Sequence, residues 1–243
     1  MRITRIYQPI PLSENLMITL DKDASHHILH VLRLQTGTQL KIFNGQGGEY
    51  DAELIGMEKK HARIKVKNFS DIKCESPLLI HLGQGIVRGE KMDLIIQKAI
   101  ELGVNEITPL ITEFSNVKLA ADRLEKKHAH WQAVAISACE QSGRNKLPKI
   151  HPPELIATWL QHSAADLKII LDPFAKTDLK NYKQAETVCI VVGPEGGFCE
   201  NELDLAKQHH FLPLQLGPRI LRTETAALAA IAILQAKWGD MSG

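Results

Sequence analysis

The sequence lacks the features that mark membrane, secreted and disulfide-stapled proteins. Its longest apolar run, from Ala226 to Leu234, is about half as long as a membrane-spanning helix needs to be. The N-terminal residues MRITRIYQPIP contain no apolar core of the kind that a signal peptide requires. The four cysteines form no C-x-x-C pair, which argues against a zinc site and fits free thiols in a reducing compartment. These absences predict a soluble, cytoplasmic protein.

A strong net charge is also absent. Lysine and arginine together number 29 and aspartate and glutamate 28, so the formal net charge is 29 − 28 = +1. Any binding to nucleic acid therefore has to come from a local basic patch rather than from the charge of the whole protein. His26 and His30 have a spacing that suits a metal ion. Because an H-E-x-x-H glutamate and a third ligand are missing, we expect structural or surface histidines and no metal.

Residues 1–72 have the pattern of a small β-barrel that contains one helix. The barrel's four expected strands are Leu16–Leu20, Gln39–Phe43, Glu49–Ile55 and Ala62–Phe69. The last two alternate polar and apolar side chains, as half-buried antiparallel strands do. Asp23-Ala24-Ser25 can begin the helix, which carries Ile28, Val31 and Leu32 toward the core. A polar stretch that ends at Pro77 then separates this region from the rest of the chain.

Residues 73–243 have the pattern of an α/β domain with a parallel sheet. Short, continuous apolar runs, typical of strands covered on both faces, occur at Leu78–Leu82, Ile107–Ile111, Ile169–Leu171 and Val188–Val192. Helical patterns separate these runs. One extends from Met92 to Ile100, with Gly103 as its C-terminal cap, and another from Leu124 to Ala138 is ended by Gly143.

A glycine-rich loop, Gly193-Pro194-Glu195-Gly196-Gly197-Phe198, directly follows the last of these strands. In open parallel sheets, ligands bind beyond the carboxyl ends of the strands. Glycines there let the backbone approach a ligand closely, but they are equally typical of a tight turn with positive φ. The spacing alone does not decide between a ligand loop and a turn. It does exclude a nucleotide-triphosphate loop, because no G-x-x-x-x-G-K-[ST] motif is present.

Two further loops carry charged residues. The segment from Leu216 to Thr225 leads into the apolar helix Ala226–Ala236 and contains Arg219, Arg222 and Glu224. Cations are disfavoured at a helix N-terminus, so the arginines indicate either a bound anion or an ordinary salt bridge with a carboxylate such as Glu224.

The other charged loop, Glu140–Lys149, holds three cations within six positions, Arg144, Lys146 and Lys149. It is either a solvated loop or one that contacts phosphates. The segment Gly83–Gly89 has the wrong spacing for a dinucleotide fingerprint, which argues against a nicotinamide enzyme.

Five strings, in this order, resemble the RsmE family of ribosomal RNA uridine-N3 methyltransferases, which belongs to the knotted SPOUT class. They are His26-His27-(x3)-Val31-Leu32-Arg33, Lys98–Val104, Glu140–Arg144, Gly193–Gly197 and Leu216-Gly217-(x)-Arg219 to Ala226. Any one of them is a weak signal, but together they span almost the whole chain. The resemblance implies a PUA-like N-terminal barrel followed by an α/β domain with a deep trefoil knot.

The resemblance also implies the function and its partners. The cofactor would be S-adenosylmethionine, the product N3-methyluridine in 16S ribosomal RNA, and the enzyme a homodimer that acts on this RNA or on the small ribosomal subunit. The alternatives are a SPOUT methyltransferase with another RNA target, such as transfer RNA, and a non-catalytic RNA-binding assembly factor. The intact glycine-containing strings favour catalysis, because RNA binding alone requires no cofactor cradle.

The site residues expected from the resemblance fall into three groups. Cofactor binding is assigned to Leu171, Gly193, Pro194, Glu195, Gly196, Gly197, Leu216, Gly217, Arg219, Ile220, Leu221 and Thr225. Uridine N3 must lose a proton before it attacks, so a carboxylate base and an arginine are needed; Glu224 with Arg222 is the first pair, and Glu195 or Glu140 with Arg144 is the reserve. RNA contacts are assigned to Arg33, Arg88, Arg144, Lys146 and Lys149.

Overall fold

The computed structural model of the chain describes residues 3–115, 121–177, 179, 182 and 184–241, which form two compact units. The first unit comprises Met1–Glu75 together with Cys139–Leu147, and the second comprises Ser76–Ala138 and Pro148–Gly243. Sequence reasoning put a boundary between residues 72 and 73. It gave no sign that the segment 139–147 clusters with the first unit.

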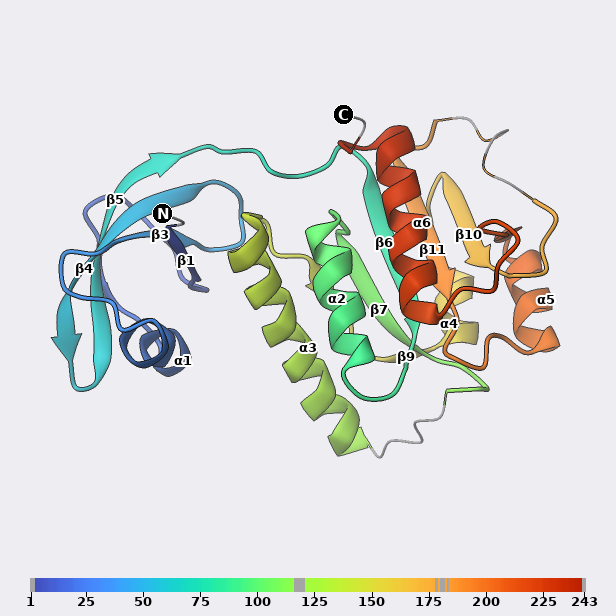
Figure 1. Ribbon diagram of the computed structural model, residues 1–243, viewed down its shortest axis with the longest axis horizontal. Helices are drawn as coiled ribbons and strands as arrows, with labels where there is room; N and C mark the ends of the chain where they lie inside the picture. Colours follow the sequence, from blue (N-terminus) through green and yellow to red (C-terminus); the bar gives the residue numbers. More distant parts are fainter. Residues whose placement is uncertain (1–2, 116–120, 178, 180–181, 183, 242–243) are drawn as a thin grey trace. The chain divides into compact units, whose positions relative to one another are not determined.

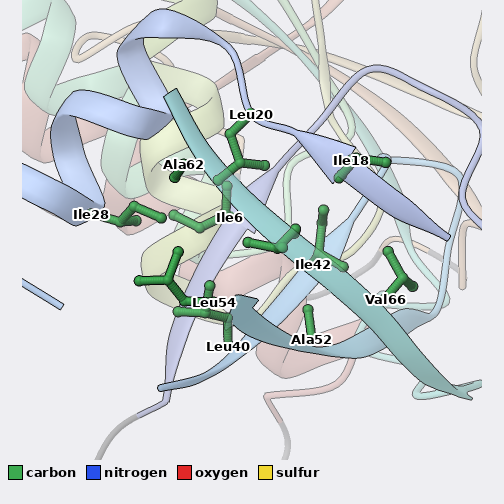
Figure 2. Packing of buried hydrophobic residues seen from close by; sticks show 11 residues of the cluster. Ile6, Ile18, Leu20, Ile28, Leu40, Ile42, Ala52, Leu54, Ala62 and Val66 are labelled. Carbon is green, nitrogen blue, oxygen red and sulfur yellow. The ribbon is translucent and has the colours of Figure 1, made fainter. Parts of the chain in front are cut away.

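The first unit is built on a five-stranded mixed sheet with the order β1-β3-β4-β5-β2. Its strands are β1 (Thr4–Tyr7), β2 (Met17–Thr19), β3 (Gln39–Phe43), β4 (Glu49–Glu58) and β5 (His61–Ser70). β1 pairs with β3 in parallel, and the other pairs are antiparallel. Alternate residues such as Ala62, Ile64 and Val66 are buried, as the period-2 pattern predicts. Figure 2 shows these side chains meeting those of the other strands in one core.

The helix of this unit differs from its sequence expectation. α1 (Lys22–His26) is capped by Asp21, whose carboxylate accepts from the Ala24 N–H at 2.8 Å, and continues as the π-helix η1 (His27–Val31). The wider π turn shifts the helical phase, so that of Ile28, Val31 and Leu32 only Ile28 is buried. Val31 and Leu32, expected in the core, are 58% and 40% exposed.

The second unit contains a parallel seven-stranded sheet, as expected (Figure 1). Six strands follow the order β12-β10-β11-β6-β7-β8, and β9 also pairs with β7. The strands are β6 (Leu79–Gly85), β7 (Glu106–Ile111), β8 (Lys149–Ile150), β9 (Glu154–Leu155), β10 (Leu167–Leu171), β11 (Thr187–Val192) and β12 (Leu212–Leu214). The helices are α2 (Lys91–Glu101), α3 (Ala121–Ser142, whose last residues belong to the first unit), α4 (Ile156–His162), α5 (Glu200–Gln208) and α6 (Thr223–Trp238).

Both faces of the parallel sheet are covered, which explains its continuous apolar strands. Cys189 and Val191 of β11 pack in a core with Trp159 of α4 and Ala206 of α5. Their neighbours along β11 point to the opposite face, where α6 packs against the strand and against α2. The two faces together bury the whole of the central strand β11 after its first residue.

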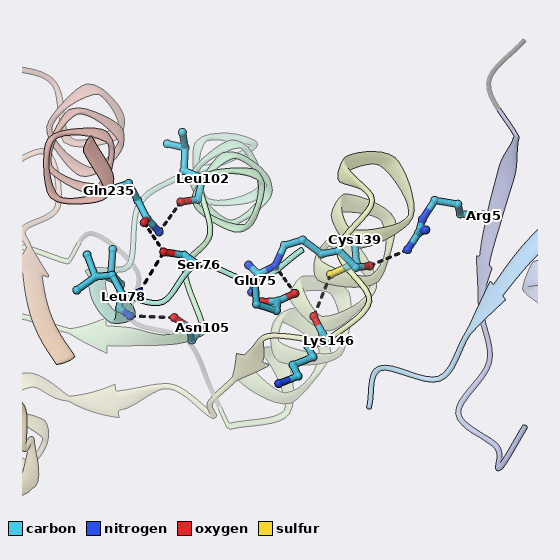
Figure 3. Close-up of polar contacts among 11 residues, drawn as sticks. Arg5, Glu75, Ser76, Leu78, Leu102, Asn105, Cys139, Lys146 and Gln235 are labelled. Carbon is cyan, nitrogen blue, oxygen red and sulfur yellow. Dashed lines mark hydrogen bonds and ion pairs between the residues drawn. The ribbon is translucent and has the colours of Figure 1, made fainter. Parts of the chain in front are cut away.

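Helix α6 is fixed near its C-terminal end by buried polar contacts. The fully buried Gln235 donates to the Leu102 carbonyl at 3.0 Å and accepts from the Ser76 hydroxyl at 2.6 Å (Figure 3). Ser76 also accepts from the N–H of Leu78, just before β6. These bonds join the end of α6 to the end of α2 and the start of the central sheet.

All four cysteines are free. Burial raises the pKa of the Cys139 thiol to about 12 and that of Cys189 to about 11, so neither forms a thiolate near neutral pH. Within the described residues, the helices are too short or too polar to cross a membrane.

Candidate cofactor and catalytic site

A cavity of about 550 Å³ lies in the second unit, beyond the carboxyl ends of β10, β11 and β12. Three segments line it, residues 171–174, 192–198 and 214–226 without 218 and 225, and Lys91 and Leu203 complete its wall. The cavity therefore lies at the edge of the sheet where parallel α/β proteins bind ligands. Its volume falls within the range of about 300–1,000 Å³ that is usual for small-molecule sites.

The cavity brings together every predicted cofactor-binding residue except Thr225. Those that line it are Leu171, Gly193, Pro194, Glu195, Gly196, Gly197, Leu216, Gly217, Arg219, Ile220 and Leu221. Thr225 is exposed in the first turn of α6 and points elsewhere. Thr223 and Ala226, three residues apart on the same helical face, line the cavity instead. Helical periodicity could have found this exchange.

The loop after β11 is both a tight turn and a cavity wall. The Gly197 N–H donates to the Pro194 carbonyl at 3.0 Å, and Gly197 has φ +70°, a conformation that favours glycine. A Cβ atom on Gly193 would lie 3.2 Å from the Gly197 backbone, and one on Gly196 would lie 2.7 Å from Cβ of Phe114. The structure therefore shows the tight turn that the sequence allowed, and this turn also lines the cavity.

Three carboxylates line the cavity, Asp172, Glu195 and Glu224, and their environments differ. Asp172 accepts the Phe174 N–H at 2.9 Å. Burial alone would raise the pKa of Glu195, but hydrogen bonds from its own backbone N–H and from Lys91, 3.2 Å away, outweigh burial and lower it. Glu195 is thus an ionised group with a cationic partner. In contrast, the Oε2 atom of Glu224 is buried and has no hydrogen-bond partner among the described residues. Glu224 is therefore a lining carboxylate with one buried oxygen that accepts no hydrogen bond from the described residues.

The reserve base, Glu140, lies in the first unit and does not line the cavity. Its carboxylate accepts the Tyr7 N–H at 2.9 Å. Burial raises the pKa of Glu140, with this hydrogen bond opposing the rise. These contacts give Glu140 a structural position beside β1.

The rim of the cavity carries exposed cations and apolar side chains. Arg219 and Arg222 both line it and are exposed, and Arg222 is the residue immediately before α6. Ile220 is 76% exposed, and Phe174 is 80% exposed. Phe174 was not expected from the sequence, where its loop shows neither glycines nor a charge pattern. Lys91, which holds Glu195, was not expected either, because its partner lies 104 residues away in the sequence.

The predicted RNA-binding cations divide into four exposed residues and one buried residue. Arg33, Arg88, Lys146 and Lys149 are exposed. Arg144 differs from its expectation: its side chain is 5% exposed and forms an ion pair with Glu75, while its carbonyl accepts from Arg5 (Figure 3). The spacing of cations in a loop could not reveal this partner, which is 69 residues away in the sequence. Arg144 thus holds the first unit together.

A group of possible metal ligands lies away from the cavity. Ligand atoms of His81, Glu106 and His151 lie within 4.8 Å of one another, near the amino ends of β6 and β7. Each side chain already has a partner: His151 pairs with Glu106 at 2.6 Å, and His81 with the Thr108 hydroxyl at 2.8 Å. Burial lowers the pKa of His81 to about 4, so this ring is neutral at physiological pH. The histidine pair considered from the sequence, His26 and His30, is exposed.

Comparison with protein families gives two matches. Residues 74–235 match the model of an RNA methyltransferase domain, and residues 20–67 match that of an RNA methyltransferase PUA domain. Among curated relatives, the ribosomal RNA small subunit methyltransferase E of Buchnera aphidicola (subspecies Schizaphis graminum) is 41% identical, with 99% of each chain covered. The Bacillus subtilis protein of the same name is 30% identical, with 86% of each chain covered.

Solved structures give the same result. A methyltransferase from Legionella pneumophila with bound S-adenosylmethionine is 41% identical, has a TM-score of 0.96, and is matched over 99% of this chain and 100% of its own. A ribosomal RNA small subunit methyltransferase E from Neisseria gonorrhoeae, also bound to S-adenosylmethionine, is 38% identical with a TM-score of 0.91. That match covers 98% of this chain and 99% of the other. The predicted fold class, α/β with an N-terminal PUA-like domain, is confirmed.

The buried pair of Arg144 and Glu75 yields a prediction about stability. Arg144→Ala should lower the free energy of unfolding by on the order of 2–4 kcal/mol, because Glu75 would keep a half-buried charge without its partner. Urea unfolding followed by circular dichroism measures this change. Lys146→Ala, two residues away and exposed, is the matched control and should stay within about 0.5 kcal/mol of the parent. Equal stability of the two variants would contradict a structural role for Arg144.

Proposed function

The chain belongs to the ribosomal RNA small subunit methyltransferase E family, and from this premise we propose that it methylates N3 of a uridine in 16S ribosomal RNA. S-adenosylmethionine is the methyl donor, and the RNA or the small ribosomal subunit is the partner. The observation that carries the proposal is the cavity at the carboxyl ends of β10–β12, whose two glycine-containing loops hold the expected cofactor residues. We place this activity in the cytoplasm.

The cavity fits S-adenosylmethionine in size and chemistry. Leu171, Val192, Leu214 and Leu221 supply an apolar wall for the adenine, and the backbone of residues 193–197 and 216–217 supplies donors and acceptors. Gly193 and Gly196 let the loop pack closely against its neighbours, since a Cβ on either residue would meet protein atoms within 3.2 Å. When bound, the cofactor supplies an electrophilic methyl group on a sulfonium cation.

The chain's own residues prepare the acceptor base. Uridine N3 carries an imide proton, and Glu224, which lines the cavity at the start of α6, takes it. Arg222, at the rim, faces the negative charge that then spreads over the uridine carbonyl oxygens. Glu195 stays ionised beside Lys91, so we assign it to holding the loop rather than to proton transfer. Positioning of the acceptor supplies most of the remaining rate enhancement.

The acceptor base has to leave its stack to reach the cavity. The PUA-like first unit carries Arg33 and Lys146, and the second unit carries Arg88 and Lys149, all exposed and available for phosphates. Contacts from Gln215 to Pro173 and Thr177 join the segment after β12 to the segment after β10, and Lys237, at the end of α6, donates to the Leu179 carbonyl. These contacts lie in the region where the resemblance implies a knot. The knot itself stays part of the proposal.

We propose that the enzyme is a homodimer formed mainly by the second unit. One face of α6 is buried, through residues such as Ala227, Ile231 and Leu234. The other face is also apolar, yet Ile233 is 43% exposed and Leu228 is only half-buried. A nearly uniformly apolar helix is stable in water when its second face is covered as well, and a second copy of the chain provides that cover.

The first prediction of this function concerns the cofactor loop. Gly196→Val should weaken binding of S-adenosylmethionine by more than about tenfold, or roughly 1.4 kcal/mol, because the new Cβ would lie 2.7 Å from Phe114 and force the loop to move. Isothermal titration calorimetry measures the affinity, and a thermal melt confirms folding. Asn201→Val, at an exposed position of α5, should bind as the parent does. Unchanged affinity of Gly196→Val would remove this loop from the site.

The second prediction distinguishes the roles of Glu224 and Glu195 in methyl transfer. Glu224→Gln should lower the rate of methyl transfer by about 10²–10⁴-fold, the usual contribution of a general base, with cofactor affinity retained. Glu195→Gln should lower it far less. Single-turnover reactions with small ribosomal subunits from a strain lacking the gene, read by mass spectrometry of N3-methyluridine, give both rates. A larger loss in Glu195→Gln would exchange the two roles, and no N3-methyluridine from the parent enzyme would refute the proposed product.

The third prediction concerns the oligomeric state. Light scattering at micromolar concentration should give twice the chain mass of 27.1 kDa. Ile233→Glu, which places a charge on the exposed apolar face of α6, should shift the protein toward monomer. A parent protein that is monomeric under these conditions would contradict the homodimer.

A further inference from the structure

A chain of hydrogen bonds joins β6 to two of the segments that line the cavity. Gln84 is the second-last residue of β6. Its side-chain amide donates to the Thr223 hydroxyl at 3.1 Å and to the Gly85 carbonyl at 3.0 Å. The Thr223 hydroxyl in turn donates to the Gly193 carbonyl at 2.6 Å. These hydrogen bonds therefore connect β6, the first residue of α6 and the start of the glycine-rich loop.

The direction of each bond is defined. Thr223 has one hydroxyl proton and gives it to Gly193, so it must accept from Gln84, which has two amide protons to give. The Oε1 atom of Gln84 is buried and finds no partner among the described residues. A buried acceptor without a partner is costly, and such groups in a native protein call for an explanation. The donor half of this amide, aimed at Thr223 and Gly85, is the half that the site uses.

The apolar surface of α6 cannot fix the rotation of the helix by itself. Hydrophobic burial has no preferred direction, and residues 226–234 are all apolar. At the far end, Gln235 holds the helix through Ser76 and Leu102. At the near end, Arg222 gives no side-chain cap, and Thr223 makes the polar contacts that fix the first turn. Glu224, the next residue, lines the cavity from that same turn.

We propose that Thr223 and Gln84 are positioning residues that set the direction of the Glu224 carboxylate relative to the glycine-rich loop. The proposal rests on the function assigned to Glu224 above. Gln84 and Thr223 are buried, at 0% and 7% exposure, and Gln84 does not line the cavity. They therefore act through the first turn of α6, by holding the base where the acceptor nitrogen arrives.

We call the hydrogen bonds from Gln84 to Thr223 and from Thr223 to the Gly193 carbonyl the relay. The test uses variants that change the relay with little change in side-chain volume. Thr223→Val removes the hydroxyl and keeps the shape, whereas Thr223→Ser keeps the hydroxyl and serves as the rescue. Gln84→Met removes the amide donors from the other side, so it tests the same bond if Thr223→Val folds poorly. Full-length enzymes are compared by melting temperature, by calorimetry with S-adenosylmethionine, and by single-turnover methylation of unmodified small ribosomal subunits.

We expect Thr223→Val and Gln84→Met to lower the single-turnover rate by about 10–100-fold, within the range that misplacement of a catalytic group produces. Cofactor affinity should change by less than about threefold, and Thr223→Ser should recover most of the rate. The decisive measurement is a double-mutant cycle with Glu224→Gln. If the relay acts through Glu224, Thr223→Val should cost almost nothing in the Glu224→Gln background, because residues that act as one unit are not additive.

The outcomes separate the relay from the proposed function. An equal loss from Thr223→Val in both backgrounds, or no loss at all, would overturn the relay while Glu224 remains the base. A loss that appears only as weaker cofactor binding would assign Thr223 to the glycine-rich loop and also overturn it. A Glu224→Gln enzyme with the parental rate would instead refute Glu224 as the base, and the relay to it would fall with that assignment.

Discussion

The rotation of α6 about its own axis is the constraint on which the cavity depends. The helix is apolar on nearly every side, so burial alone would accept several rotations. Two buried glutamines remove this freedom. Gln235, near the end of α6, donates to the Leu102 carbonyl, and Gln84 of β6 donates to Thr223 at the start of α6. Both glutamines connect α6 to β6 or its approach, since Gln84 lies in β6 and Gln235 accepts from Ser76 just before it. The polar contacts are few, but they decide which side chains of α6 face the cavity.

The parallel sheet supplies the second part of the arrangement. Because α2 and α6 cover one face and α4 and α5 the other, the strands can be apolar throughout, and openings are left only at their ends. At the carboxyl end of β11, Gly193 and Gly196 allow the loop to pack where a Cβ atom would meet protein atoms within 3.2 Å. The charged groups there differ by their partners, since Lys91 neutralises Glu195 while Glu224 keeps an unpaired oxygen. Among the described residues, one lining carboxylate is therefore paired with a cation, and another has a buried oxygen without a partner.

Local patterns predicted most elements of the fold. Periodicity found the main strands and helices, such as Gln39–Phe43 and the helix that Gly143 ends, because these signals depend on neighbouring residues. It failed where the backbone departs from regular geometry, at the π-helix after α1, and where a partner lies far away in the sequence. Arg144 was expected at phosphates, and its partner Glu75 could be seen only in the folded chain. Phe174 and Gln84 gave no sequence signal for the same reason: their roles come from tertiary neighbours.

The position of the cavity walls along the chain has a consequence for folding. The walls come from segments between Lys91 and Ala226, and strands from distant parts of the sequence must pair in parallel before these segments meet. Such non-local pairing is intrinsically slow, so the ligand site is complete only after most of the second unit has formed. A ligand that binds only this finished state stabilises it by about 2.7 kcal/mol when its concentration is 100 times the dissociation constant. Cofactor binding would therefore stabilise the contacts among these wall segments, which are the last of the second unit to come together.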